Sequence, residues 1–250
     1  MASTVGKQWK IVDEAMRAFL VALSRLEPSA PTWSAGWSAH EITAHVAAAA
    51  QERADLIEEH LAGHPARATR TWEEREPPFR ALPGEQLRDR LVLEASRFER
   101  AVADMAADDS IVYTGWEMTA EQLRTHSHSE AALHRWDLVG EDETSRRLLS
   151  EPVLTSHALA VFAAIPTLGQ RWTDARFTTR PVRLRSAGQP DVLVDPGSGL
   201  SLLAPIDGDL VIPLDPDDRL LILWGRCPSA LRSPTANAET VDDLLVRLCG

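Results

Sequence analysis

The sequence predicts an α+β protein with a bundle of four helices in residues 1–145 and a smaller α+β domain in residues 150–250. Two patterns support this division. Apolar side chains recur at helical spacing through the first 140 residues, whereas after residue 150 short apolar runs alternate with turn residues. A chain of 250 residues is long enough to bury a core in each of two modest domains.

Four helices are expected in the first part, over residues 5–26, 38–63, 85–105 and 119–139. The first and third carry an apolar residue every three or four positions, which gives each of them one buried face. The second and fourth begin with capping boxes, Ser38 with Glu41 and Thr119 with Gln122. Residues 64–84 and 108–117 are expected to be connections, and the first is long enough to be of functional interest.

The second part combines helix and strand. Residues 152–172 are expected to form a helix that ends or kinks at Pro166, because proline interrupts helical hydrogen bonding. Turn residues separate short apolar runs, which predicts strands at residues 182–184, 192–194, 200–203 and 210–214. Residues 220–224 fit either a strand or a helix, and residues 240–248 are expected to form a closing helix.

The composition excludes several classes of protein. A net charge of −11 argues against binding to a nucleic-acid backbone. The two cysteines, Cys227 and Cys249, form no C-x-x-C motif, which favours a reducing compartment. The N-terminal residues lack the apolar core of a secretory signal, and the longest apolar stretch, residues 158–168, is too short to cross a bilayer. We therefore expect a soluble cytoplasmic protein with no nucleic-acid or membrane partner.

The fourth expected helix carries two ionisable residues on its inward face. Glu130 and His134 are four residues apart, so their side chains lie one turn apart on the same side. Burying them without a partner would be costly, and a divalent cation would compensate them. His45 lies on the inward face of the second expected helix, between Ile42 and Ala49. Two imidazoles and one carboxylate suit zinc and leave a coordination position open, which is typical of catalytic sites.

Other interpretations of the same residues stay open. A Glu-x-x-x-His pair also occurs by chance, and a single histidine on an apolar face is commonly a hydrogen-bonded core residue. His126 lies close to the Glu130 face and is either a substitute ligand or a partner of one. His40 is expected near the opening of the site, and His128 on the opposite, solvated side of its helix.

Three segments resemble the mycothiol-dependent maleylpyruvate isomerase family, part of the broader DinB-like metalloprotein superfamily. Residues 36–47 contain Gly-Trp-Ser followed by Ile42 and His45-Val46-Ala47, residues 130–138 read EAALHRWDL, and residues 223–226 read Leu-Trp-Gly-Arg. The resemblance covers nearly the whole chain, and its segments occur in the family's order.

The resemblance implies that His45, Glu130 and His134 bind zinc in a DinB-like bundle, and that the metal binds the thiol of mycothiol. A metal-bound thiol is a thiolate at neutral pH and is therefore nucleophilic. Such a thiolate adds to an activated double bond and leaves again, giving isomerisation, or displaces a leaving group and stays, giving S-transfer. The resemblance also implies that Arg226 faces the cleft as a catalytic and cofactor-binding residue, and that Trp37 walls the pocket.

Two further features accompany the site. Arg67, Arg70, Arg75 and Arg80 lie on the long connection, where they either line the cleft or, in the favoured interpretation, are solvated. Asp137 either orients a ligand histidine or caps the end of its helix.

The leading hypothesis is a zinc-dependent S-transferase or isomerase that uses mycothiol and an electrophilic small molecule, as a monomer or homodimer. The polar residues at positions 126–129 depart from the family pattern, so the maleylpyruvate reaction itself is not carried over. One alternative is a non-enzymatic module that binds a metal and a thiol. Another is a metal-dependent hydrolase with zinc-bound water, which is weakened by the lack of a general base at H-E-x-x-H spacing.

Overall fold

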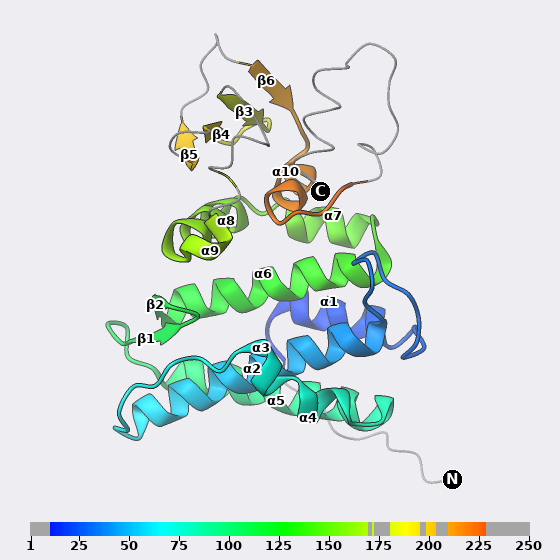
Figure 1. Cartoon of the computed structure of the whole chain (residues 1–250), viewed down its shortest axis with the longest axis vertical. Helices are drawn as coiled ribbons and strands as arrows, with labels where there is room; N and C mark the ends of the chain where they lie inside the picture. Colours follow the sequence, from blue (N-terminus) through cyan, green and yellow to red (C-terminus); the bar gives the residue numbers. More distant parts are fainter. Residues whose placement is uncertain (1–10, 170–171, 173–180, 196–198, 204–209, 229–250) are drawn as a thin grey trace. The chain divides into compact units, whose positions relative to one another are not determined.

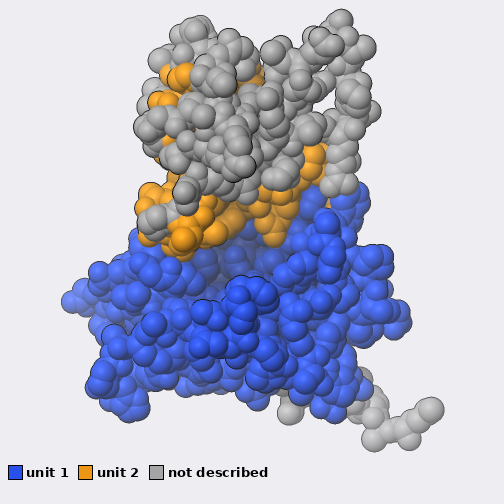
Figure 2. Space-filling view, viewed as in Figure 1, with its two compact units in different colours: residues 1–139 blue, residues 140–250 orange. Residues whose placement is uncertain are grey.

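The protein is represented by a computed structural model that describes residues 11–169, 172, 181–195, 199–203 and 210–228. The chain divides into two compact units, Met1–Val139 and Gly140–Gly250 (Figure 2). The first unit is helical, and the second contains a sheet, so the predicted α+β fold class is confirmed.

Four long helices make up the first unit: α1 (Glu14–Leu23), α2 (Ala39–Leu61), α5 (Gly84–Asp104) and α6 (Ala120–Val139). α2 packs along α5 and α1 along α6, while α2 also contacts α6 (Figure 1). All four predicted helices are present. The first is shorter than predicted: it begins at Glu14 because the side chain of Asp13 accepts a hydrogen bond from Met16 N and caps it there.

Both predicted capping boxes form and fix where α2 and α6 begin. Ser38 N donates to Glu41 Oε2 at 2.8 Å, and Glu41 N donates to Ser38 Oγ at 3.3 Å. Thr119 N donates to Gln122 Oε1 at 2.9 Å, and Gln122 N donates to Thr119 Oγ1 at 3.4 Å. Each pair satisfies backbone donors that the first turn leaves unbonded, so the start and the inward face of each helix follow from the local sequence.

The core of the first unit is formed by the apolar faces of these helices. Its fully buried members come from all four: Phe19 on α1, Ile42 and Ile57 on α2, Leu87 and Leu91 on α5, and Leu123 on α6. Burying this apolar surface is the main source of stability for the scaffold that holds the site.

The two connections contain structure that the sequence did not predict. Residues 62–83, here called the α2–α5 segment, hold the short helices α3 (Trp72–Arg75) and α4 (Pro77–Arg80). Between α5 and α6, strands β1 (Ser110–Tyr113) and β2 (Trp116–Thr119) form a hairpin. Thr114 and Gly115, its two turn residues, both have positive φ, 51° and 84°. Two turn residues with positive φ match the twist of paired strands. Because threonine rarely adopts a positive φ, the sequence did not predict this turn.

The second unit combines helices with a four-stranded sheet. Helices α7 (Glu143–Leu149), α8 (Pro152–Ala164) and α9 (Pro166–Gly169) precede the sheet, and α10 (Pro216–Leu223) follows it. The sheet contains β3 (Val182–Arg185), β4 (Asp191–Asp195), β5 (Gly199–Leu203) and β6 (Leu210–Pro213). Its strand order is β5-β4-β3-β6, with β3 parallel to β6 and the other pairs antiparallel.

The predictions for this unit are confirmed where the structure describes them. All four strands are present, the helix from residue 152 ends before Pro166, and α10 settles residues 220–223 as helix. α7 was not predicted. The helix predicted at residues 240–248 lies outside the described residues. Within the described ranges, no helix is both long enough and apolar enough to cross a membrane.

Candidate metal centre

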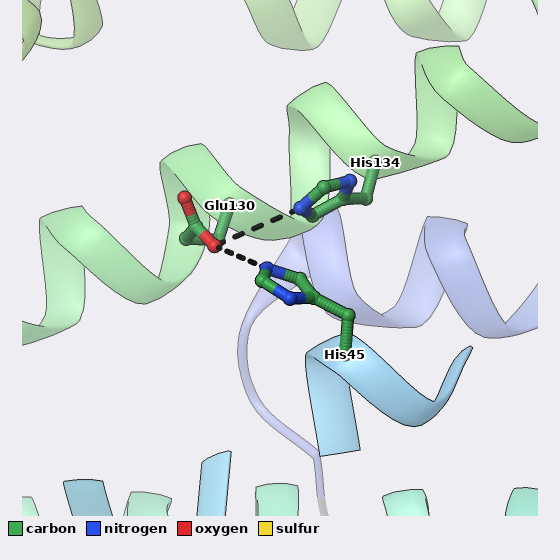
Figure 3. A group of neighbouring side chains, drawn as sticks. All are labelled: His45, Glu130 and His134. Atoms are coloured by element: carbon green, nitrogen blue, oxygen red, sulfur yellow. Dashed lines mark ion pairs between the residues drawn. The ribbon is translucent and has the colours of Figure 1, made fainter. Parts of the chain in front are cut away.

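At the centre of the candidate site, one carboxylate lies between two histidines. His45 Nε2 and His134 Nε2 are each 3.7 Å from Glu130 Oε2 (Figure 3). His45 comes from α2, whereas Glu130 and His134 come from successive turns of α6 (Figure 3). One ligand atom from each of the three residues lies within 4.8 Å of the other two. Among the described residues, this is the one group of three potential ligands that is so compact.

A buried carboxylate holds each histidine by its other ring nitrogen. His45 Nδ1 lies 2.6 Å from Glu76 Oε1, and His134 Nδ1 lies 2.8 Å from Asp137 Oδ2. Glu76 is 1% exposed and Asp137 is fully buried. Because a carboxylate accepts hydrogen bonds, it keeps the ring proton on Nδ1, and the neutral ring then has its lone pair on Nε2. When both rings are neutral, their Nε2 lone pairs point toward Glu130, as in histidines that bind metals.

Glu76 was not among the residues expected at the site. It lies between α3 and α4 in the α2–α5 segment, and its second oxygen accepts hydrogen bonds from Arg80 Nε at 3.0 Å and Nη2 at 2.9 Å. The spacing of four residues predicts this local pair with Arg80. Nothing in the sequence indicates the contact with His45, which is 31 residues away and depends on how the segment folds back over α2.

The charges of the site favour a bound cation. Burial by itself would raise the pKa of Glu130, but hydrogen bonds from His134 and His45 outweigh burial and hold the pKa well below its usual value. The pKa of Glu76 is also lowered, because the hydrogen bond and charge of His45 outweigh its burial. Burial would lower the pKa of His134, yet Asp137 and Glu130 raise it to about 9. Without a metal ion, the proton on His134 supplies the positive charge that a bound cation would otherwise supply.

Trp37 lies beside His45, and its role as a wall of the pocket stays a prediction. Its ring meets the ring of His45 edge-on, with 5.8 Å between the centroids. The guanidinium of Arg80 lies over the Trp37 ring at 5.2 Å from the centroid, a cation–π contact. Trp37 therefore packs against the same arginine that holds Glu76.

Arg226 belongs to the second unit, in the turn that follows α10. It is half-buried, and its Nη1 donates to Trp224 O at 3.1 Å. The structure describes this arginine only within its own unit. Its role at the site of His45, Glu130 and His134 therefore stays a prediction.

The other histidines near the site have different partners. His126 is buried and packs edge-on against the Tyr113 ring, with centroids 5.4 Å apart. His40 Nε2 lies 3.0 Å from Arg80 O. The prediction that His128 is solvated is wrong: its side chain is 17% exposed and its Nδ1 lies 2.7 Å from Asp13 Oδ2. α1 packs along α6, so that face of α6 is covered as well.

The arginines on the α2–α5 segment were expected to be solvated; three of them are partly exposed but also form ion pairs. Arg67 and Arg70 both form ion pairs with the buried carboxylate of Glu52, at N–O distances of 2.6 Å and 2.5 Å. Arg80 pairs with Glu76 and with Glu41. These ion pairs tie the segment to α2 and so hold Glu76 against His45. Of the two roles expected for Asp137, the structure shows contact with a histidine of the site.

The matches to known proteins agree with this architecture. A family model described as the mycothiol maleylpyruvate isomerase N-terminal domain matches residues 9–139, more than half of the chain. The chain belongs to this family. The matched region contains His45, Glu130, His134 and both carboxylates that hold the histidines. The resemblance stated from short segments is therefore confirmed, and membership of the mycothiol maleylpyruvate isomerase family rests on the whole helical unit.

Two crystal structures share the fold. They are the mycothiol-dependent maleylpyruvate isomerase, with a TM-score of 0.56, and a histidine-to-alanine mutant of it, with a TM-score of 0.58. Each is 16% identical in sequence, and each match covers 84% of this chain and 85% of that chain. At this identity the likeness shows a common fold, in which a helical part precedes a smaller part with a sheet. No curated protein matches the sequence.

Proposed function

We propose that this chain is a metal-dependent enzyme that activates the thiol of mycothiol for S-transfer to, or isomerisation of, an electrophilic small molecule. One observation carries the proposal: two histidine Nε2 atoms converge on one oxygen of Glu130, and buried carboxylates hold both Nδ1 atoms. Family membership supports mycothiol as the thiol, because the family model and both crystal structures are named for mycothiol.

The donor set fits zinc. Atoms bound to one tetrahedral zinc at about 2.0–2.2 Å lie about 3.3–3.6 Å apart. The two distances of 3.7 Å between the histidine nitrogens and Glu130 Oε2 are close to this spacing, so little movement is needed to bind an ion. When bound, zinc supplies a Lewis acid that stabilises a thiolate at neutral pH.

The chain itself supplies position, charge and access. His45 and His134 direct neutral donor atoms to one point, and Glu130 adds a negative charge that favours a divalent cation. The side chains of His45, Glu130 and His134 are 21%, 21% and 14% exposed, so a small molecule can reach them. Trp37 would limit the space beside His45, and Arg226 would bind an anionic group of thiol or substrate. A cytoplasmic location is part of this proposal.

The test uses cobalt as a spectroscopic substitute for zinc. Mycothiol is titrated into the cobalt-loaded protein, and the absorption of a sulfur-to-cobalt charge-transfer band is recorded. We expect the band to saturate in the wild type and to be absent in His45→Ala. His60→Ala is the matched control, because His60 lies on the same helix, near its C-terminal end, and pairs with Asp109 instead. This control should bind cobalt and thiol as the wild type does.

Each alternative result has a distinct meaning. A wild type that binds no cobalt would refute the metal site. Bound cobalt without a thiol band would refute thiol activation and favour hydrolysis by metal-bound water, or a binding module without catalysis. If the band forms, the concentration of free thiol after turnover distinguishes the two reactions, because isomerisation regenerates the thiol and S-transfer consumes it.

A further inference from the structure

A second cluster of the helical unit combines burial with unmatched positive charge. Arg53, two turns after His45 on α2, is 1% exposed. Its Nη1 and Nη2 lie 3.5 Å from Tyr113 Oη and Ser127 Oγ, at the long limit of a hydrogen bond. Its guanidinium lies over the rings of Phe98 and Tyr113, and its Nε has no hydrogen-bond partner. A fully buried cation thus has only neutral and distant partners.

A second guanidinium approaches the same hydroxyl group. Arg75 is half-buried at the end of α3, and its Nη1 lies 3.4 Å from Tyr113 Oη. Its Nε is buried and also has no hydrogen-bond partner. Two positive charges therefore meet at one phenol oxygen, which can accept only weak hydrogen bonds from them. This arrangement is unfavourable unless an anion lies nearby.

Neighbouring arginines show that carboxylate partners were available in this region. Glu52, adjacent to Arg53 in sequence, pairs with Arg67 and Arg70. Asp55 pairs with Arg70 and Arg97. Within the described part of the chain, neither Arg53 nor Arg75 forms an ion pair with an acidic side chain. Glu52 and Asp55 are thus used by other arginines, and Glu130 lies between His45 and His134. Among the described residues, this leaves the two guanidiniums without a carboxylate partner.

We propose that Arg53, Arg75 and Tyr113 form a subsite that binds the carboxylate group of a small molecule. A guanidinium presents parallel N–H groups that match the two oxygens of a carboxylate, and the phenol hydroxyl supplies a further donor. The rings of Phe98 and Tyr113 lie against the guanidinium of Arg53, which is 1% exposed, and low exposure to water strengthens a charge-assisted hydrogen bond. Arg75, which is half-buried, gives the ligand its access from solvent.

The subsite lies close to the candidate metal centre along the same two helices. Ser127 precedes Glu130 by three residues, a rise of about 4.5 Å along α6. On α2, long side chains lean toward the helix N-terminus, so the Arg53 side chain leans toward His45. A carboxylate at the subsite would orient a substrate whose reacting carbon lies at the metal centre. Orientation of a substrate in this way rests on the proposed function. Binding of a carboxylate to the subsite does not depend on it.

The single tyrosine of the chain, Tyr113, allows a direct test. Protein labelled with 3-fluorotyrosine gives one ¹⁹F resonance, which reports on the subsite. Sodium acetate is titrated into the full chain at constant ionic strength, before and after treatment with a chelator. We expect a saturable shift of this resonance, with half-saturation on the order of millimolar for so small a ligand. Sodium chloride should give no saturable shift, and phosphate should bind more weakly than acetate.

Variants distinguish binding from a structural role. Arg75→Gln should weaken acetate binding about tenfold, because it removes one charge-assisted hydrogen bond. Arg88→Gln is the matched control, since Arg88 donates to Leu26 O and lies outside the cluster, and it should leave the titration unchanged. A missing acetate shift, an equal response to chloride, or an unchanged titration in Arg75→Gln would overturn the proposal. If phosphate binds more strongly than acetate, the subsite is one for phosphate, and the assignment to a carboxylate is overturned. Because metal-free protein suffices, a failed cobalt titration does not affect this result.

Discussion

The contact between Glu76 and His45 gives the sharpest test of the candidate metal centre. We predict that Glu76→Gln weakens zinc binding about tenfold to hundredfold. Glutamine has the same shape and keeps an oxygen that can accept the hydrogen bond of His45 Nδ1, now 2.6 Å from Glu76 Oε1. The substitution therefore removes one negative charge and keeps the side-chain shape of a residue that is 1% exposed. The amide NH2 that replaces Oε2 cannot accept the hydrogen bonds of Arg80, so thermal unfolding must be measured beside zinc affinity.

The magnitude follows from Coulomb's law. Across the imidazole ring, the carboxylate of Glu76 lies about 7 Å from an ion bound at Nε2, and a charge product of 2 gives ~1 to ~5 kcal/mol for an effective dielectric constant of about 80 to 20. Arg80 Nη2, 2.9 Å from the other oxygen of Glu76, cancels part of this attraction. We therefore expect about 1.4–2.7 kcal/mol, which corresponds to a tenfold to hundredfold loss of affinity.

The assay is a competition for zinc between the protein and a chromophoric chelator of known affinity. Glu73→Gln is the matched control, because it removes the same charge from an exposed position on α3, the short helix that ends just before Glu76. Thermal unfolding of the metal-free variants checks that both fold. An affinity of Glu76→Gln within twofold of the wild type would refute the reasoning, and an equal loss in Glu73→Gln would show a general effect of net charge.

Three further predictions concern protonation and packing. The pKa of His134 is raised to about 9, so the ring is protonated below that pH and must lose its proton to bind a metal ion. Zinc binding near neutral pH should therefore release about one proton. Zinc affinity should rise about tenfold per pH unit up to about pH 9. Calorimetry in buffers of different ionisation enthalpy measures this release, and its absence would contradict the prediction. Phe19→Ala should lower the free energy of unfolding by about 3–5 kcal/mol, because Phe19 is fully buried on α1. Urea titration measures this loss. The control Val21→Ala, at a position that is 54% exposed, should change the free energy of unfolding by less than about 0.5 kcal/mol. Burial alone would raise the pKa of Glu52, but Arg67 and Arg70 lower it below 4.5, so this residue stabilises the fold above about pH 4.5 and the contribution is lost as the pH falls further. In Glu52→Gln the urea midpoint should depend less on pH in this acidic range, and an unchanged dependence would show that Glu52 is not responsible.

The helices and the three candidate ligands could be predicted because local signals specify them. The capping boxes at Ser38 and Thr119 fix where α2 and α6 begin, and the apolar spacing then fixes which faces point inward. His45, Glu130 and His134 follow directly from those faces. Local sequence was therefore sufficient wherever a regular helix carries the functional residue.

Residues that act through irregular segments could not be predicted in the same way. The contact of Glu76 with His45 depends on the path of the α2–α5 segment, which side-chain ion pairs set rather than periodicity. The burial of His128 was missed because the sequence shows one inward face of α6, whereas packing against α1 covers a second one. The lack of an acidic partner for Arg53 among the described residues was equally hidden, since a sequence does not show which acids the neighbouring arginines bind.

The ionic attachment of the α2–α5 segment has a kinetic consequence. Apart from Phe79, which is buried, the segment is joined to α2 mainly by ion pairs of Arg67, Arg70 and Arg80 with acidic residues. Salt screens the more exposed of these pairs, Arg80 with Glu41, more than it weakens apolar contacts, so we expect local opening of the segment to become more frequent as ionic strength rises. Each opening withdraws Glu76 from His45 while the four long helices stay folded. The lifetime of a bound ion would then follow the opening rate of this short segment, so metal exchange could be fast in a protein whose global unfolding is slow.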